Sequence, residues 1–366
     1  MIETRSKMDD RLPNRIVKGR ASASARSGRF EKLTREIVLD GWTPEEDLVA
    51  PRPRTEILPD TSRTVLARNQ SPDIPFDRSV NPYRGCEHGC IYCYARPTHA
   101  YLGLSPGLDF ETKLFTKKDA AKQLRAELSK PGYSPAPIGF GANTDPYQPV
   151  EKALGISRSI LEVLRDFGHP VLVTTKGALV TRDIDILGEM ASRGLAHVAI
   201  SVTTLDRHLA NRLEPRASTP ALRLGAIEAL AKAGIPVSIL AAPVIPGLTD
   251  QETEAILAEG AKAGATGAGY TLLRLPLEIR ELVEEWLTLH APDRKDKVLN
   301  LIRSIRGGAL NVSEFGARMK GTGPYADMIR QRFRLACRRH GLDAPRPALR
   351  CDLFRVPGRA QQLGLF

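Results

Sequence analysis

Three of the chain's five cysteines lie within eight positions, in the stretch NPYRGCEHGCIYCYARP at residues 81–97. Cys86, Cys90 and Cys93 form a CxxxCxxC pattern, and no fourth cysteine lies nearby. A structural zinc site normally has four protein ligands and a closed shell. Three thiolates instead suit a 4Fe-4S cluster in which one iron keeps an open coordination position for a substrate. The missing fourth ligand is then functional.

Two other interpretations of these cysteines stay open on the residues alone. His88 or His99 could complete a Cys3His zinc site, and the chain would then be a zinc-stabilised nucleic-acid-binding protein whose basic ends do the binding. Buried thiols without any metal are the plain structural alternative. Metal analysis separates the 4Fe-4S cluster from the zinc site, because a cluster contains iron and acid-labile sulfide, whereas the zinc site holds one zinc ion.

The residues around the cysteines resemble a known family. Tyr92 gives the motif the form CxxxCxΦC, where Φ is aromatic, and this form resembles the signature of the radical S-adenosylmethionine (radical SAM) superfamily. Within that superfamily the chain is most similar to the spore photoproduct lyase-like group, through CIYCYARP (90–97), GANTDPYQPVE (141–151) and TTKG (174–177). The resemblance covers roughly residues 78–280.

The resemblance implies an enzyme with two cofactors. Cys86, Cys90 and Cys93 would bind the 4Fe-4S cluster, and its open iron would chelate the amino and carboxylate groups of S-adenosylmethionine. The reduced cluster would cleave the sulfonium C–S bond to give a 5′-deoxyadenosyl radical, which abstracts hydrogen from the substrate. A low-potential electron donor, such as a flavodoxin or a ferredoxin, is therefore an expected partner.

The resemblance also implies contacts to S-adenosylmethionine from the C-terminal ends of strands, where parallel barrels place their chemistry. Asn143, Thr144 and Asp145 are expected near the methionine amino group. Lys176 is expected to pair with the carboxylate, and Ser201 to reach the ribose or the methionine end. The other candidates are two tyrosines that flank Cys93 and could pack near the adenine, and a polar pair near the ribose: Tyr92, Tyr94, Glu214 and Arg216.

Each of these side chains has an ordinary structural role as its alternative. Asn-Thr-Asp-Pro is also a turn sequence, in which Asp145 would bond to the backbone. Lys176 could be solvated, and Ser201 could be a satisfied hydroxyl in an apolar strand. Glu214 and Arg216 could cap the helix that follows.

One departure from the group concerns the hydrogen donor. The resemblance would place a cysteine in the loop after the second strand, to return a hydrogen atom to the product radical, but this chain has Ala142 there. No cysteine lies between Cys93 and Cys337. The resemblance would imply repair of thymine dimers with a cysteine hydrogen donor, and the absence of that cysteine argues against this reaction by the same route. Cys337 and Cys351 are then the donor candidates, although Cys337 lies in an amphipathic pattern that favours a buried structural thiol.

The elements that must position these residues follow from the hydrophobic pattern. Short apolar runs begin near residues 138, 171, 198, 237 and 268, and segments with helical spacing that end at glycine separate them. This rhythm predicts repeated βα units with a parallel sheet that curls into a full or partial barrel. No GxGxxG or GxxxxGK[ST] pattern supports a nucleotide-binding fold of another type. The resemblance narrows the prediction to a partial (β/α)6 TIM-like radical SAM barrel.

The two ends of the chain are expected to be extensions of this barrel. Residues 1–77 form an N-terminal extension, in which residues 1–35 lack an apolar period and are expected to be disordered, and residues 50–77 lie extended on the domain surface. Residues 78–280 form the core barrel. Residues 281–366 form a basic helical C-terminal extension that ends in a proline-rich tail wrapped around the domain.

The chain has 366 residues, 42% of them apolar and 26% charged, and a formal charge of +11, as expected of a globular protein of one or two domains. Residues 294–366 carry 16 Lys/Arg and 5 Asp/Glu, so this region makes nucleic acid a candidate partner. No stretch is long and apolar enough for a membrane span or a signal peptide, so we expect no membrane partner and a cytoplasmic location. In that reducing compartment disulfides are not expected.

Overall fold

The computed structural model describes residues 17–31, 54–345 and 348–358. Its main sheet has seven strands, and six of them run parallel and are neighbours in chain order. The six are β3 (Arg78–Val80), β6 (Ile138–Phe140), β7 (Val171–Thr175), β8 (Ala196–Ser201), β9 (Val237–Val244) and β10 (Gly267–Leu272). The seventh, β2 (Leu66–Arg68), pairs antiparallel with β3 at the edge. The predicted partial barrel of six parallel strands is confirmed.

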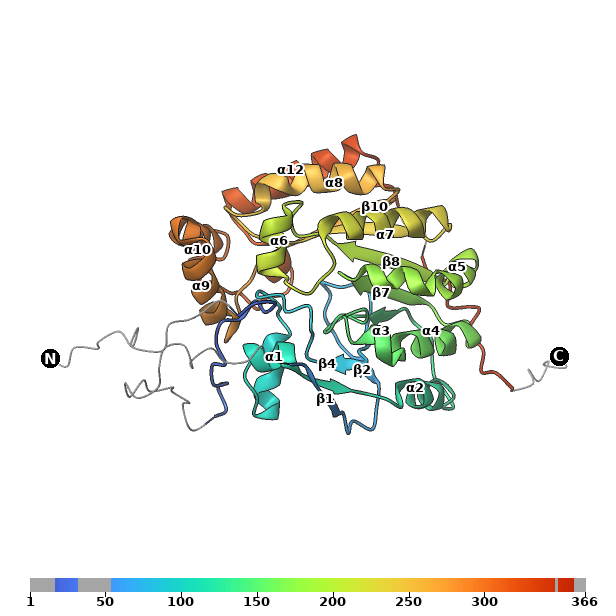
Figure 1. Cartoon of the computed structure of the whole chain (residues 1–366). Helices are drawn as coiled ribbons and strands as arrows, with labels where there is room; N and C mark the ends of the chain where they lie inside the picture. Colours follow the sequence, from blue (N-terminus) through green and yellow to red (C-terminus); the bar gives the residue numbers. More distant parts are fainter. Residues whose placement is uncertain (1–16, 32–53, 346–347, 359–366) are drawn as a thin grey trace.

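Helices cover the outer face of this sheet (Figure 1). Those that connect successive strands are α2 (Ala120–Leu128), α3 (Glu151–Leu154), α4 (Ile156–Asp166), α5 (Ile184–Ser192), α6 (Arg207–Leu213), α7 (Pro220–Lys232) and α8 (Thr253–Lys262). The local sequence of α7 shows how such a helix is delimited. The Thr219 hydroxyl accepts a hydrogen bond from the Leu222 amide, Pro220 occupies the first turn, and Gly234 (φ +72°) takes the left-handed conformation after the last turn.

A second, three-stranded sheet lies beside the barrel and was not predicted. It consists of β1 (Glu56–Pro59), β5 (Lys113–Thr116) and β4 (Tyr83–Arg84), with β5 in the middle. Because β4 leads directly into the cysteine motif, this sheet fixes where that segment begins. The segment ends in the 3-10 helix η1 (Arg96–Leu102), which α1 (Leu108–Thr112) follows.

The region after β10 is helical. It comprises α9 (Ile279–His290), η4 (Pro292–Arg294), α10 (Lys295–Ser304), α11 (Ala317–Lys320) and α12 (Pro324–Arg339). Helix α12 lies along α8 (Figure 1), where Arg332 forms an ion pair with Glu254 at 2.6 Å. Within the described ranges, no helix is long and apolar enough to cross a membrane.

The described part of the tail, residues 348–358, lies across the N-terminal ends of the strands. The Arg350 amide donates to the Gly194 carbonyl, just before β8, and the Arg355 amide donates to the Phe167 carbonyl, just before β7, both at 3.0 Å. The Phe354 ring packs 5.4 Å from the Tyr133 ring, centroid to centroid. The tail therefore covers the end of the sheet opposite the cysteine motif.

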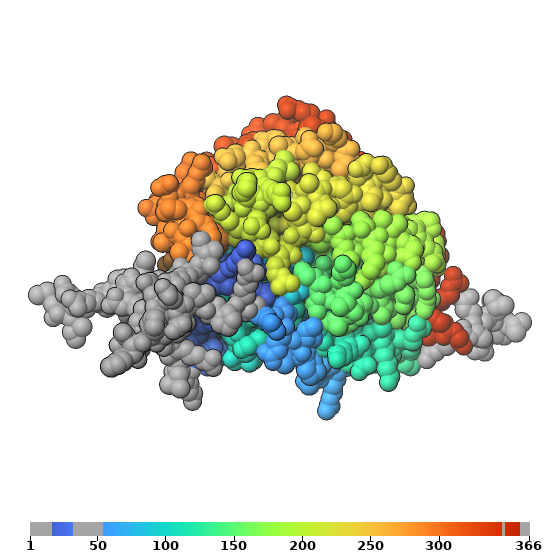
Figure 2. All heavy atoms as spheres, in the orientation of Figure 1, coloured from blue at the N-terminus to red at the C-terminus, as the bar shows by residue number. Residues whose placement is uncertain are grey.

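The N-terminal segment 17–31 differs from the expected disorder. Arg20 and Ser22 are only 7% and 1% exposed, and the segment, dark blue in Figure 2, lies between α1 and the orange α9. The Ala21 and Ser22 amides and the Arg20 side chain all bond to the buried residue Glu111. Order here comes from polar contacts, which need no apolar period in the sequence. Residues 1–16 and 32–35 of the predicted disordered region lie outside the described residues.

Candidate active site

The three clustered cysteines lie on one loop at the C-terminal end of the parallel strands, between β4 and η1. All three are free thiols; Cys86 and Cys90 are 6% and 9% exposed. Gly85 and Gly89 give the loop its shape, with φ of +79° and +68°. A Cβ atom at Gly85 would lie 2.8 Å from Leu114 Cδ2, so the loop is pressed against the small sheet. Glycine at these two positions permits the positive φ angles and, at Gly85, the close approach of the loop to the sheet.

A fully buried ion pair holds the outer side of this loop. Arg96 and Glu111 are both 0% exposed, and Arg96 Nη2 lies 2.6 Å from Glu111 Oε1. Arg96 also donates to the Gly89 and Cys90 carbonyls, each at 2.8 Å. The amides of Ala21 and Ser22 donate to the two carboxylate oxygens of Glu111. The N-terminal segment therefore completes the shell that positions Cys90.

The inner side of the loop is held by polar groups from the rest of the barrel. Gln148 accepts a hydrogen bond from the Glu87 amide at 2.8 Å and donates to the Gly85 carbonyl at 3.3 Å. Arg216 Nη2 lies 3.0 Å from Glu87 Oε1, and its amide donates to the His88 carbonyl. Arg216 is thus bound to the cysteine loop itself and does not cap the next helix.

Asp145 connects the loop after β6 to the loop after β7. Its carboxylate accepts hydrogen bonds from the Tyr147 amide (2.8 Å), the Thr175 hydroxyl (2.6 Å) and the Lys176 amide (2.7 Å). His88 Nδ1 lies 3.3 Å from Asp145 Oδ2. Burial opposes ionisation, but His88 and the hydrogen bonds outweigh it and lower the pKa of Asp145 to about 2. Asp145 is therefore ionised and already saturated by the protein.

The two residues before Asp145 are also bonded to the protein. The amide of Asn143 donates to Asn81 Oδ1 at 2.8 Å, and the Thr144 hydroxyl donates to the Tyr83 carbonyl at 2.8 Å. Thr144 is 2% exposed, whereas Asn143 is half-buried. Of the three, only the side chain of Asn143 makes no hydrogen bond within the described residues, and it keeps its amide group for another partner.

Lys176 and Ser201 meet above the ends of β7, β8 and β9. Lys176 Nζ donates to Ser201 Oγ at 3.0 Å, and Ser201 donates to the Ala242 carbonyl at 2.8 Å. Burial lowers the pKa of Lys176, and the nearness of the Cys90 thiol opposes that shift. The lysine is half-buried and has no carboxylate bonded to its ammonium among the described residues, so it is placed to receive an anion.

Tyr92 and Glu214 form a buried polar cluster behind the cysteines. The Tyr92 hydroxyl donates to Glu214 and lies 3.0 Å from Thr203 Oγ1, which donates to Glu214 at 2.6 Å. Arg223, 2% exposed, forms an ion pair with Glu214. Burial raises the pKa of Glu214, and the Arg223 guanidinium opposes this shift. Lys176 Nζ lies 5.8 Å from the centroid of the Tyr92 ring, so this cluster adjoins the lysine.

Tyr94, on the other side of Cys93, is 49% exposed and lies at the rim of the site. Its hydroxyl donates to the carbonyl of Ala142, the residue that stands in the loop after β6. The Arg274 guanidinium carbon lies 5.5 Å from the Tyr94 ring centroid. Tyr92 and Tyr94 therefore differ in role: one is bonded in the interior, and the other offers an open face.

Burial dominates the electrostatics of the three thiols. Burial raises the pKa of all three thiols, and Asp145 raises that of Cys86 further, while Lys176 lowers the pKa of Cys90 and Cys93. Thiolates at such a partly desolvated site would need a cationic partner, and a bound metal centre can provide one. Within the described residues, no three His, Cys, Asp or Glu side chains converge on one ion position. For a group such as a 4Fe-4S cluster, Cys86, Cys90 and Cys93 would be the protein ligands.

The histidines do not complete a zinc site with these cysteines. His88 Nδ1 lies near Asp145, as described above, and His99 Nε2 lies 3.0 Å from the Lys113 carbonyl oxygen. Burial lowers the pKa of His99, and its ring packs on Phe110 at 5.1 Å. Within the described residues, neither histidine groups with these cysteines at a possible metal position.

The structure does not bring Cys337 and Cys351 to this site. Cys337 is 5% exposed on α12 and belongs to the main hydrophobic core with Tyr270, Leu272 and Ile329, whereas Cys90 packs in a separate cluster under α9 and α10. Cys351 lies in the tail, at the opposite end of the sheet, next to Arg350. A hydrogen-donor role for either thiol has no geometric support.

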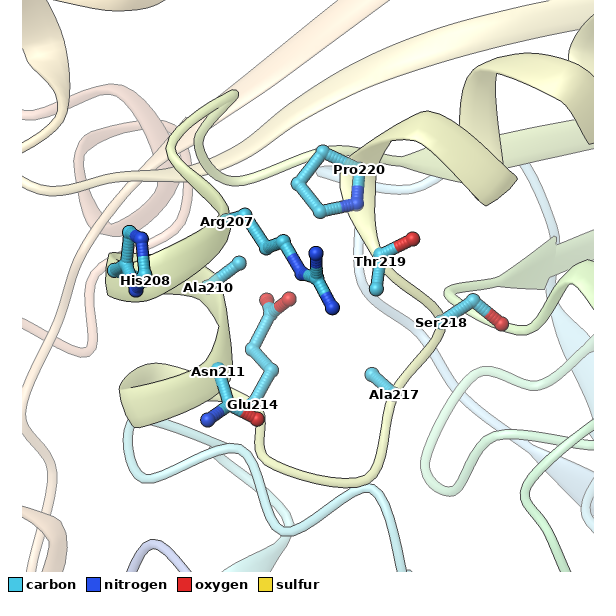
Figure 3. Close-up of a pocket in the computed structure, with 9 residues that line it drawn as sticks. All are labelled: Arg207, His208, Ala210, Asn211, Glu214, Ala217, Ser218, Thr219 and Pro220. Atoms are coloured by element: carbon cyan, nitrogen blue, oxygen red, sulfur yellow. The ribbon is translucent and has the colours of Figure 1, made fainter.

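A pocket of about 410 Å³ lies beside the polar cluster, between α6 and the start of α7 (Figure 3). Its lining includes Arg207, Asn211, Glu214 and Thr219, and Figure 3 shows the Glu214 side chain directed toward Arg207. None of the cysteines lines it. Since Glu214 also bonds to Tyr92, the pocket is separated from the cysteine loop by this buried pair.

Sequence reasoning missed the residues that hold the loop. Arg96 and Gln148 lie inside the quoted motifs CIYCYARP and GANTDPYQPVE, which was the available signal, but nothing local indicates their partners. Glu111 and Arg223 stand in no motif. The only local sign of a role at the site is that each is a charged residue in a part of the chain that must be buried. Their partners are 15 and 9 positions away in sequence.

The family model described as "Radical SAM superfamily" matches residues 80–259. An uncharacterized protein of Mycobacterium tuberculosis is 36% identical over 261 residues, which cover 71% of this chain and 73% of the relative. An uncharacterized protein of Methanocaldococcus jannaschii is 27% identical over 173 residues, or 47% of this chain and 62% of that protein.

Among solved structures, spore photoproduct lyase has a similar fold. Its complex with dinucleoside spore photoproduct has a TM-score of 0.53 and 16% sequence identity, and the match covers 78% of this chain and 79% of that one. A double mutant with bound AdoMet and dinucleoside spore photoproduct has a TM-score of 0.54, 15% identity and coverage of 78% of each chain. At this identity the likeness concerns the fold.

Proposed function

The chain belongs to the radical SAM superfamily, and from this premise we propose that it is a 4Fe-4S enzyme that cleaves S-adenosylmethionine reductively and abstracts hydrogen from a nucleotide-containing substrate. The observation that carries the proposal is the loop of Cys86, Cys90 and Cys93 at the C-terminal end of six parallel strands. Superfamily membership makes the chain an enzyme of S-adenosylmethionine-dependent radical chemistry. The cluster, the contacts and the substrate are the parts proposed here.

In this proposal Cys86, Cys90 and Cys93 hold the cluster, and the Arg96–Glu111 pair keeps their loop in place. When bound, the cluster supplies the electron that breaks the sulfonium C–S bond and releases the 5′-deoxyadenosyl radical. The protein's own contribution is to position the thiolates and exclude water, which the low exposure of Cys86 and Cys90 supports.

Lys176 and Ser201 are the proposed anchors of the cosubstrate. The half-buried ammonium of Lys176 would bind the methionine carboxylate, and the Ser201 hydroxyl, 3.0 Å away, would bind the same end. The free amide of Asn143 would contact the methionine amino group. Thr144 and Asp145 would act through the loop backbone, because their side chains are bonded to the protein.

Tyr92, Glu214 and Arg216 would support the site from behind, and Tyr94 would border the adenine or the substrate. Tyr92 and Glu214 bond to each other, and Arg216 is paired with Glu87 on the cysteine loop. These contacts favour positioning of the loop over direct contact with the ribose.

A low-potential cytoplasmic flavodoxin or ferredoxin is the proposed electron donor, because the cluster must be reduced before the sulfonium can break. Nucleic acid is the proposed substrate class, supported by the charge of +11 and by the name of the structurally similar lyase. Since Ala142 stands where that group would have a donor cysteine, the final hydrogen transfer must differ from the route that the group's cysteine would provide.

The proposal is tested by loading the anaerobic protein with iron and sulfide and measuring 5′-deoxyadenosine after reduction with dithionite. We expect about four irons per chain and measurable product, both lost in Cys90→Ala. Cys351→Ala is the matched control, because this thiol lies at the far end of the sheet, and it should behave as the unmodified protein. A colourless protein that binds one zinc and no iron would refute the enzyme and restore the zinc-stabilised nucleic-acid-binding alternative.

A further inference from the structure

The C-terminal end of β10 carries an arginine that is not paired within the described part of the chain. Arg274 follows β10 by two residues, and its guanidinium carbon lies 5.5 Å from the ring of Tyr94, next to Cys93. The side chain is half-buried and makes neither a hydrogen bond nor an ion pair with any described residue. A partly desolvated guanidinium without an anion is unusual, because it has lost water and has gained the Tyr94 ring but no hydrogen-bond acceptor among the described residues.

The neighbouring charged groups do not neutralise Arg274. Arg318 forms an ion pair with Asp73, and Asp73 also accepts a hydrogen bond from the Gly316 amide at 2.7 Å. Arg306, 2% exposed, donates to the Leu272, Leu273 and Arg318 carbonyls and has no carboxylate among the described residues. Burial and Arg318 lower the pKa of Arg274, while Tyr94 and Asp73 oppose the shift. Asp73, the carboxylate that acts on Arg274 among the described residues, is therefore engaged, and positive charge remains in excess.

Exposed aromatic rings accompany these cations. Phe315 is 54% exposed, and the Arg318 guanidinium carbon lies 4.6 Å from its ring centroid; Tyr94 is 49% exposed beside Arg274. Aromatic faces next to arginines are how proteins bind unpaired bases and their backbone, because every base can stack and every phosphate attracts a guanidinium. A carboxylate ligand would use the arginine but would leave the rings without a role.

We propose that Arg274, with Phe315 and the exposed face of Tyr94, binds a phosphorylated nucleoside of the substrate at the rim of the cysteine loop. Arg274 would receive the phosphate oxygens, and the exposed rings would offer a stacking surface for the base. This inference rests on the proposed function, because it assigns the substrate class to that same site. The nucleotide could be free or part of a strand, and the two sources share this chemistry.

The test measures binding of a short fluorescein-labelled single-stranded oligonucleotide to the reconstituted protein by anisotropy over a series of salt concentrations. We expect Arg274→Gln to weaken binding about tenfold and to reduce the slope of log affinity against log salt by about one. Arg274→Lys should recover part of the affinity, since lysine keeps the positive charge but lacks the bidentate hydrogen-bonding geometry of the guanidinium. Phe315→Ala should weaken binding without a change in slope, because stacking releases no counterions.

Arg334→Gln is the matched control, because it removes the same charge from an exposed position on α12, and it should change affinity less than about twofold. Competition with adenosine monophosphate separates the sources: displacement of the probe supports a free nucleotide, and its failure supports a strand. Equal effects of Arg274→Gln and Arg334→Gln, or no binding of either the oligonucleotide or adenosine monophosphate, would overturn the proposal. Loss of S-adenosylmethionine binding in Arg274→Gln would overturn it too, by placing this arginine at the cosubstrate.

The binding measurement and the 5′-deoxyadenosine assay fail independently. Oligonucleotide affinity requires no reduction of the cluster and no cleavage of the cosubstrate. A protein that releases 5′-deoxyadenosine but binds neither the oligonucleotide nor adenosine monophosphate refutes only the inference about Arg274. A protein that binds the probe but yields no product refutes only the chemistry.

Discussion

Gly89 is the residue at which the cysteine loop touches the buried Glu111 carboxylate. Its φ is +68°, and an ideal Cβ atom there would lie 2.7 Å from Glu111 Oε2. Gly103 has nearly the same φ, +66°, but no atom lies within 4 Å of its ideal Cβ. Alanine at either position has the cost of a left-handed backbone, but only alanine at Gly89 would also collide with Glu111. A comparison of the two substitutions therefore separates these two effects.

We expect Gly89→Ala to reduce the iron incorporated on anaerobic reconstitution severalfold, because the loop must move away from Arg96 and Glu111. Gly103→Ala should cost only the roughly 1–2 kcal/mol of a left-handed alanine and should bind iron normally. Iron analysis and urea unfolding of both variants make the comparison. Equal iron contents would show that the close approach at Gly89 does not matter.

His169 gives the protein a pH-dependent stability. The side chain is 0% exposed, and burial lowers its pKa to about 4 from the ordinary 6.5. The unfolded chain therefore takes up a proton more readily than the folded chain. The contribution of neutral His169 to the free energy of unfolding is fully present above pH 6.5. It is lost as the pH falls toward 4, and the free energy of unfolding falls by about 3 kcal/mol in total.

In His169→Gln this part of the pH dependence should disappear, although the variant can be less stable at every pH. Tyr133 donates to His169 Nε2 at 2.8 Å, and glutamine offers an amide oxygen to the same hydroxyl. Urea unfolding midpoints measured between about pH 7 and pH 4 give the result. Parallel curves for the two proteins would contradict the assignment to His169.

At the scale of the elements, the N-terminal segment 17–31 supports the cysteine loop through Glu111 and Arg96. Its Ala21 and Ser22 amides satisfy both oxygens of Glu111, and Glu111 is the counter-ion of Arg96. A buried ion pair that loses hydrogen-bond partners becomes costly, because its remaining lone pairs are desolvated.

Ser22→Pro removes one of these two amide donors, and we expect the cluster-free protein to expose Cys90 more often as a result. The rate of maleimide labelling of the peptide that contains Cys90 should rise about tenfold, as for the loss of one buried charge-assisted hydrogen bond. Arg26→Gln is the control in the same segment. It breaks only the exposed pair with Glu281, whose side chain is 63% exposed, and labelling should stay unchanged.

A truncated protein that begins at residue 32 provides a second measurement of the same contact. It should incorporate less iron than Arg26→Gln and label faster than Ser22→Pro. Normal iron content in the truncated protein would mean that the segment merely covers the loop without supporting it.

The elements that sequence reasoning identified are those whose own residues carry the signal. β6 to β10 are apolar runs, and α10 and α12 are amphipathic, so each could be assigned before any contact was known. β3 (Arg78–Val80) and β5 (Lys113–Thr116) are too short and too charged for that, and their strand conformation depends on pairing with distant neighbours. The cysteines were predicted by spacing, whereas Arg96 and Glu111 could not be, because only the folded chain brings them to the loop.

At the scale of the whole molecule, the site and the tail occupy opposite ends of the sheet. Phe354 packs against Phe167 at 6.1 Å and Tyr133 at 5.4 Å, near the starts of the strands. We expect Phe354→Ala to lower the free energy of unfolding by about 2 kcal/mol, less than for a fully buried ring. Because the cysteines are remote, 5′-deoxyadenosine formation at low temperature should not change. A matched loss of product and iron would mean that the two ends are coupled.

The basic charge of the C-terminal region is divided among several places. Arg332 and Arg330 are paired with Glu254 and Asp327, and Arg350 and Arg355 lie in the tail. The sequence made this whole region a candidate nucleic-acid surface, since a linear count cannot show which cations are paired or which end of the sheet they reach. Arg274, the proposed phosphate-binding residue, lies outside the basic stretch.

The tail also bears on how the nascent chain matures. Arg350 follows Gly194, the residue whose carbonyl it binds, by 156 positions. At translation rates of about 5–20 residues per second, the base of β8 stays uncovered for roughly 10–30 s after it leaves the ribosome. During that interval the half-made barrel presents apolar surface and unbonded carbonyls, which is the kind of surface a ribosome-associated chaperone binds. Iron delivery during translation would therefore meet a protein whose cysteine end is complete before its opposite end is sealed.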